Sequence, residues 1–165
     1  MPTTHLTVLG SLVLLALLSL RRLAGAVTIL PFQSTETDLY LLTVTSPTTS
    51  RAVAVGTGSG SFGSFQSLGS QDSDFSDPLH QVVSNGHFTQ DYGGGTTLFS
   101  TFSGTATATS STAGTFALTI SFIGRTGCLG SIVGGSGTAT GTFQLLSTNP
   151  DRIENVATRS CWWEA

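Results

Sequence analysis

Apolar or small side chains alternate with hydroxyl-bearing side chains along most of this 165-residue chain. In residues 114–124 every second position is Phe116, Leu118, Ile120 or Phe122, and the positions between them are occupied mainly by threonine and serine. A period of two is typical of a strand with one buried and one solvated face. Glycine also recurs too often for stable amphipathic helices. The pattern therefore predicts an all-β protein.

The same alternation predicts further strands along the chain. We expect strands at residues 39–46, 51–58, 62–68, 97–109, 114–124, 137–146 and 152–163. Residues 80–91 form either one strand or two short ones divided at Asn85-Gly86, a dipeptide that is typical of hairpin turns. The Asp-, Ser- and Pro-rich residues 70–78 have the composition of a surface loop, and YGGG at residues 92–95 predicts a turn.

The inner faces of these strands mix large aromatic residues with glycine and alanine. Residues 97–109, for example, carry Phe102, Gly104, Ala106 and Ala108 on one face and hydroxyl groups on the other. Small residues suit places where strands curl and approach closely, and threonine suits a solvated strand face. A flat two-sheet sandwich would carry bulky residues more evenly across its inner faces. We therefore favour a single antiparallel barrel over a sandwich.

An apolar stretch at residues 6–20 precedes the alternating region. As a helix it is too short to cross a bilayer, and Ala24-Gly25-Ala26 has the small-x-small pattern of a signal-peptidase site. We expect a cleavable signal helix at residues 1–26, a β-barrel domain at residues 27–165, and a secreted or extracytoplasmic protein. Arg21 and Arg22 follow the apolar stretch instead of preceding it, which leaves an uncleaved membrane anchor as the alternative.

Charged side chains are sparse, with six basic against nine acidic residues and a net charge of −3. The chain lacks lysine altogether, so it has no basic surface for the phosphates of a nucleic acid or for an anionic membrane. We expect neither nucleic acid nor, after signal cleavage, a membrane as a partner. A small hydrophobic ligand and a second copy of the chain remain as the partners to consider.

Cys128 and Cys161 are the only two cysteines of the chain. In an oxidising compartment an even pair favours a disulfide, and two free thiols, buried as small apolar side chains, are the alternative. The cysteines and the histidines His80 and His87 show none of the close spacings of a zinc site. We therefore expect no cofactor.

Aspartates gather in one short segment, at positions Asp72, Asp74 and Asp77. Alternating carboxylates are typical calcium ligands, but this segment lacks the glycine and the terminal glutamate of an EF-hand loop. A solvated acidic loop is the favoured interpretation, and we expect no metal. No nucleophile, base and acid show a spacing that would identify a catalytic triad, so no catalytic residue is assigned.

Seven glycines lie within the twenty residues 124–143, GRTGCLGSIVGGSGTATGTF. A phosphate-binding P-loop is excluded because the chain has no lysine, and a dinucleotide-binding turn is excluded because a threonine-alternating strand follows. The hydrophobic residues within the stretch argue against a disordered linker. The remaining interpretation is a turn- and bulge-rich corner between two barrel strands.

This corner resembles that of the small barrels related to allene oxide cyclase and the dirigent proteins. The similar stretches are residues 124–130 with 135–141, GTGSGSFGSFQSLG at residues 56–69, and residues 85–107, the last two being closest to bacterial relatives of unknown function. Cys128-Leu129 replaces the usual Arg-Phe, and Gly94-Gly95 lacks the usual Asp. The resemblance implies an antiparallel barrel of about eight strands, often trimeric in plant members. It transfers no catalytic residue to this chain.

We expect a secreted, non-catalytic β-barrel that binds a small apolar ligand or serves as an extracellular structural or interaction module. The expected ligand contacts are the inner-face residues and one C-terminal tryptophan: Phe102, Phe116, Leu118, Phe122, Phe143 and Trp162. The alternative is a cyclase- or dirigent-like enzyme that guides a reactive intermediate inside the barrel. For that alternative only His87, Asn155 and Arg159 are candidate polar groups.

Overall fold

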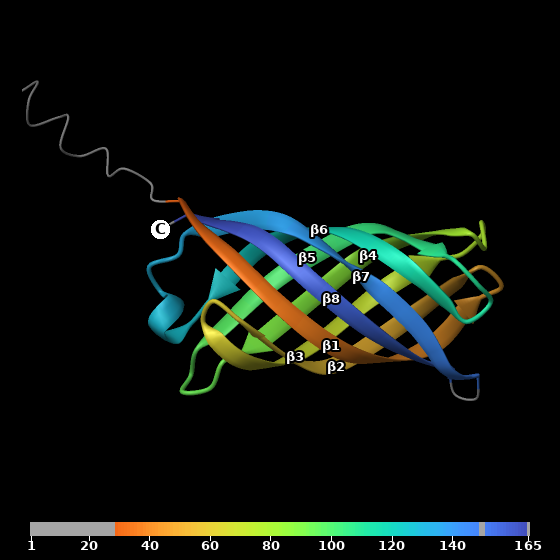
Figure 1. Cartoon of the computed structure of the whole chain (residues 1–165), viewed down its shortest axis with the longest axis horizontal. Helices are drawn as coiled ribbons and strands as arrows, with labels where there is room; N and C mark the ends of the chain where they lie inside the picture. Colours follow the sequence, from red (N-terminus) through yellow and green to blue (C-terminus); the bar gives the residue numbers. More distant parts are fainter. Residues whose placement is uncertain (1–28, 149–150, 165) are drawn as a thin grey trace, which may run out of the picture.

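The computed structural model describes residues 29–148 and 151–164, which form one closed antiparallel barrel (Figure 1). Its strands are β1 (Ile29–Ser46), β2 (Thr49–Gly60), β3 (Gly63–Asp74), β4 (His80–Asp91), β5 (Thr97–Ala108), β6 (Ala113–Arg125), β7 (Gly134–Thr148) and β8 (Asp151–Glu164). Each strand pairs with the next, and β1 pairs with β8, so no described strand has a free edge. The prediction of a barrel is confirmed. The expected signal segment, residues 1–26, lies outside the described residues.

The two ends of the barrel differ. One end holds the start of β1, the end of β8, and a short 3-10 turn η1 (Gly127–Leu129) between β6 and β7 (Figure 1). There Trp163 stacks on Phe122, with ring centroids 4.3 Å apart, and meets the edge of Phe32 at 5.1 Å. Leu129 and Ile132 of the glycine-rich corner are also buried. We call this the plugged end, and the opposite end, where β1 turns into β2, the open end.

Strands β5 to β8 follow the sequence prediction within a few residues. The inner faces of β5 and β6 bury Phe102, Ala106, Ile120 and Phe122, as the alternation predicted. The glycine-rich corner is a turn that contains η1 and leads into β7, as expected. In these strands oily inward and hydroxyl-bearing outward positions differ strongly, so the two faces are easy to distinguish in sequence.

The predicted surface loop at residues 70–78 is wrong in its first half. Strand β3 continues to Asp74 and pairs there with both β2 and β4. Outward polar side chains support this pairing, since Arg51 of β2 forms an ion pair with Asp72. Residues 80–91 form one strand, and a bulge between Val83 and Gly86 places Asn85 at a φ of 49°. The hairpin dipeptide therefore marks a bulge instead of a turn.

Strand β1 begins about ten residues earlier than the sequence analysis expected. Its inward positions near the plugged end include Ser34, Glu36 and Asp38, all buried. Polar side chains at these positions hide the alternation on which the prediction relied. The barrel interior is therefore polar on the β1 side and apolar on the side of β5 and β6.

Strand β2 provides the space for these inward side chains of β1. Its inward positions are Ala52, Ala54, Gly56, Gly58 and Gly60, whereas Val53 and Val55 point outward. A Cβ atom added to Gly56 would collide with Asp38 Oδ1. The same Cβ atom would also lie 2.5 Å from Thr37 O and 2.8 Å from Ser67 Oγ. Only glycine allows β2 to lie so close to the polar face of β1.

An outward apolar patch follows from the same arrangement. Leu39 pairs with Val55, which pairs with Leu68, and Leu41 pairs with Val53. All of these side chains are at least partly exposed. These five side chains form an apolar patch on the outer face of β1 to β3.

We predict that Gly56→Ala lowers the free energy of unfolding by about 2 kcal/mol or more, because β1 and β2 must separate to admit the methyl group. Gly124→Ala is the matched control, since its added Cβ would lie 3.4 Å from the ring of Phe99, an ordinary contact. It should change stability by less than about 0.5 kcal/mol. Urea unfolding followed by circular dichroism measures both, and equal stabilities would contradict the close approach.

Candidate functional site

A buried ion pair crosses the interior between β8 and β1. The Nη2 atom of Arg159 lies 2.6 Å from Oε2 of Glu36, and their side chains are only 7% and 0% exposed. The guanidinium carbon of Arg159 also lies 4.3 Å from the centroid of the Phe88 ring, in a cation–π contact. Antiparallel pairing of β1 with β8 places Arg159 opposite Ser34, two residues before Glu36. The strand register therefore brings the ion pair together.

A second carboxyl group lies beside the first. Asp38 lies close enough to Glu36 for the two carboxyl groups to influence each other, and Ser67 Oγ donates to Asp38 Oδ1 at 2.9 Å. Burial raises the pKa of Glu36 to about 8, with Arg159 lowering it and Asp38 raising it further. Burial likewise raises the pKa of Asp38. The two carboxyl groups therefore titrate as a pair that retains a proton at neutral pH, because two adjacent buried carboxylates repel each other.

An interior cavity of about 170 Å³ extends from this polar cluster toward the open end. Its floor includes Asp38, Tyr40, Asn155 and Arg159. The wall formed by β4 to β7 is mostly apolar: Val83, Phe88, Phe102, Ala106, Phe116, Leu118, Ile120, Ala139 and Phe143. Further polar side chains line the rest of the cavity: Ser50, Gln71, Ser73, Gln81 and Ser100. Alanines on several strands leave this space unfilled. The cavity therefore has a mostly apolar wall and charged groups at its floor.

The structure brings most of the predicted ligand-contact residues to this cavity. Phe102, Phe116, Leu118 and Phe143 line it. Phe122 points inward but belongs to the plug, where it stacks on Trp163.

Trp162 is outside the cavity, on the outer face of β8, and is 57% exposed. Its neighbour Trp163 is the inward tryptophan, with 0% exposure. Adjacent residues of a strand point to opposite faces, so one of the two had to face outward. The composition of the segment does not distinguish the two residues, and the predicted ligand contact Trp162 does not lie in the cavity.

The predicted disulfide between Cys128 and Cys161 is absent, and both residues are free thiols. Cys128 is exposed in η1, where its sulfur accepts a hydrogen bond from Thr96 Oγ1 at 3.4 Å. Cys161 is buried on the inner face of β8, and burial raises its pKa to about 11. The rim turn and the barrel interior keep the two sulfur atoms apart.

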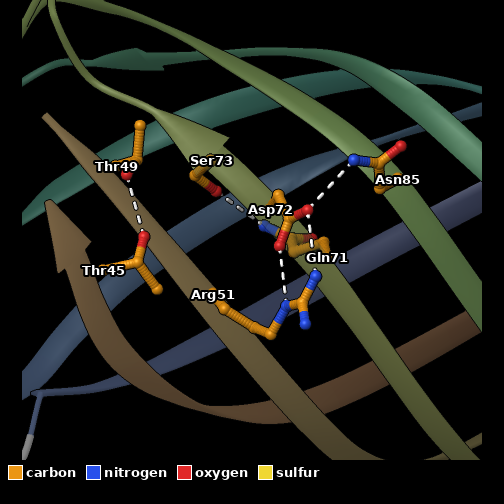
Figure 2. Close-up of polar contacts among 7 residues, drawn as sticks. All are labelled: Thr45, Thr49, Arg51, Gln71, Asp72, Ser73 and Asn85. Carbon is orange, nitrogen blue, oxygen red and sulfur yellow. Dashed lines mark hydrogen bonds and ion pairs between the residues drawn. The ribbon is translucent and has the colours of Figure 1, made fainter.

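The aspartate segment forms protein contacts instead of a cation site. Arg51 donates to both carboxylate oxygens of Asp72, and Asn85 Nδ2 donates to Oδ2 at 3.0 Å (Figure 2). These contacts lower the pKa of the Asp72 carboxyl. No group of three His, Cys, Asp or Glu residues suited to a metal occurs within residues 29–148 and 151–164.

His80 and His87 lie away from the cavity. His80 Nδ1 is 3.2 Å from Asp77 Oδ2 at the open-end loop, and both side chains are exposed. His87 is exposed on β4, one residue before the inward Phe88. Of the polar candidates for an enzyme, only Asn155 and Arg159 reach the cavity, and His87 does not.

The carboxyl groups of Glu36 and Asp38 are the site residues that sequence reasoning missed. A signal was present, because residues 32–40 alternate as Phe32, Ser34, Glu36, Asp38 and Tyr40 on one face. When burial is inferred from hydrophobicity alone, two acidic residues at inward positions are predicted to be exposed. A basic residue at an inward position of β8, Arg159, is the partner that makes such burial tolerable.

Comparisons of this chain with protein-family models, with curated proteins and with solved structures found no match. The resemblance to allene oxide cyclase and dirigent proteins therefore stays a prediction. The barrel that this resemblance implied is observed, but a barrel hosts many unrelated functions. Function has to be argued from the cavity and its charged floor.

We predict that the protein loses stability as the pH rises from 5 to 8. The pKa of Glu36 is raised from 4.5 to about 8, so the folded state holds a proton that the unfolded state releases over this range. The free energy of unfolding should fall by on the order of 3 kcal/mol between these pH values, measured by urea unfolding.

Glu36→Gln should flatten this pH dependence, because the amide can donate to Asp38 and accept from Arg159 without titrating. Glu154→Gln, at an exposed position of β8, is the control and should retain the wild-type slope. A Glu36→Gln variant with the same slope as wild type would show that the Glu36 carboxyl is not the titrating group.

Proposed function

We propose that this protein is a secreted β-barrel that binds a small, largely apolar molecule in its interior without transforming it. The single observation that carries the proposal is the cavity of about 170 Å³ between the polar floor and the open end. Concave sites with apolar walls and a few convergent polar groups are the usual form of small-molecule sites. Secretion is supported by the apolar stretch and small-x-small pattern of residues 6–26.

The volume of the cavity limits the size of the ligand. An apolar cavity of about 150 Å³ in a protein core binds benzene. The chamber of this barrel is similar in volume, and five phenylalanines line it: Phe75, Phe88, Phe102, Phe116 and Phe143. A substituted benzene ring fits both the volume and the aromatic lining, since rings favour stacked or edge-to-face contacts.

We predict that the wild-type protein binds isopropylbenzene saturably, and that Ala106→Leu abolishes or weakens this binding by at least about tenfold. Ala106 lines the cavity, so leucine would fill the volume that the ligand needs. Ala117→Leu is the matched control, because Ala117 is exposed on neighbouring β6, opposite Thr105. Ligand-observed NMR measures the affinities. Equal binding by both variants, or none by the wild type, would contradict a ligand site in the cavity.

A second candidate function is a cyclase- or dirigent-like enzyme that guides a reactive intermediate inside the barrel. The observation that favours it is the proton-holding carboxyl of Glu36 beside the guanidinium of Arg159, which itself lines the cavity. A buried acid with a pKa raised to about 8 is suited to donate a proton near neutral pH. Perturbed carboxyls of this kind cluster at active sites.

We predict that such an enzyme would open styrene oxide with stereochemical bias. Glu36 gives a proton to the epoxide oxygen as the benzylic C–O bond breaks, and water adds to that carbon. The proton that this water loses restores the acid, and the product is the diol. Chiral chromatography of the diol and the residual epoxide measures the bias, which Glu36→Gln should remove and Glu154→Gln should retain. Racemic products at the buffer rate would exclude epoxide opening and leave the binding function standing.

A further inference from the structure

We propose that the cavity selects an uncharged ligand with a hydrogen-bond-accepting oxygen, such as a ketone or aldehyde, which accepts from the guanidinium of Arg159. This inference rests on the proposed binding function and specifies the chemical class of its ligand. It follows from three properties of the floor of the cavity: unused donors, a fixed guanidinium, and a balanced charge.

The first property is that Arg159 has unused donors. Its Nη2 atom lies against Glu36, but Nε and Nη1 have no hydrogen-bond partner among the described residues. The side chain is 7% exposed and lines the cavity. A buried donor without an acceptor is destabilising, because it loses its hydrogen bonds to water without replacing them. A ligand oxygen at the floor would remove this penalty, whereas a pure hydrocarbon would leave it in place.

The second property is that the guanidinium is held before a ligand arrives. The ring of Phe88 lies under it at 4.3 Å, and the carboxyl of Glu36 holds one edge at 2.6 Å. The neighbouring carboxyl of Asp38 is itself held, because it accepts a hydrogen bond from Ser67 Oγ. Because the donors are fixed by packing, a ligand need not order them, and more of the hydrogen-bond energy appears as affinity.

The third property is the balance of charge. Because Glu36 and Asp38 together retain a proton, the positive charge of Arg159 faces one negative charge on this pair. A ligand carboxylate would add a second negative charge beside Asp38, and a ligand cation would lie against the guanidinium. Unpaired charges are strongly disfavoured in a poorly hydrated interior. An uncharged oxygen acceptor uses the donors of Arg159 without disturbing this balance.

A matched ligand series tests the inference on the wild-type protein at pH 7. Isopropylbenzene, acetophenone, benzoate and benzamidinium share one ring and one branched substituent, and differ in polarity and charge. We expect acetophenone to bind about tenfold or more tightly than isopropylbenzene, benzoate and benzamidinium. Ligand-observed NMR gives the ranking. The infrared carbonyl stretch of bound acetophenone should shift to lower wavenumber, as expected for a hydrogen-bonded carbonyl.

The variant Arg159→Leu with Glu36→Gln and Asp38→Asn removes the donors together with both carboxyl groups beside them, which avoids leaving an unpaired charge. It should lose the preference for acetophenone over isopropylbenzene. If this variant does not fold, the wild-type ranking and the carbonyl shift decide alone.

The possible failures are distinguishable. Equal affinity for isopropylbenzene and acetophenone, or an unshifted carbonyl stretch, would overturn the inference and leave the binding function intact. Tightest binding of benzoate or benzamidinium would overturn the charge argument. Failure of all four ligands to bind would overturn the proposed function, and the inference with it.

Discussion

The burial of Arg159 against Glu36 and Asp38 is the constraint to which the rest of the barrel is fitted. Moving charges from water into a protein interior is costly unless each is paired and hydrogen-bonded. Three features meet this requirement: the proton on Glu36, the hydroxyl of Ser67, and the contact of the guanidinium with Phe88. The glycines of β2 make room for these buried groups, because a side chain at Gly56 would occupy the position of the Asp38 carboxyl.

This cluster also divides the interior into two parts. At the plugged end the aromatic rings of Trp163, Phe122 and Phe32 pack together. Leu129 and Ile132, from the corner around η1, pack in the same cluster. Toward the other end, alanines and widely spaced phenylalanines leave the cavity. The same strands therefore supply rigidity at one end and a chamber at the other. A floor held by packed aromatic rings below it presents its polar groups to the chamber in a fixed geometry.

The sequence predicted the barrel and the aromatic wall because oily and hydroxyl-bearing residues alternate clearly in β5, β6 and β7. It predicted the polar floor only in part, since Arg159 and Asn155 were candidates but Glu36 and Asp38 were not. Inward carboxyls do not follow the rule that polar residues face water, and their burial depends on an arginine more than 120 residues away. Strand register likewise determines which of Trp162 and Trp163 faces inward. The course of the chain at the corner determines that Cys128 and Cys161 lie apart. No local pattern contains that information.

The free-energy cost of burying this charged cluster bears on the function of the cavity. Buried ion pairs are often no more stabilising than apolar residues of the same volume, and their replacement can raise stability. A barrel shaped for stability alone would gain from a hydrocarbon core at this level, since the plug beside it shows that these strands accommodate large aromatic residues. The charged groups instead line a chamber, and donors of Arg159 remain unused. Such an arrangement is disadvantageous in an inert module and useful in a site that recognises a polar group on an apolar molecule.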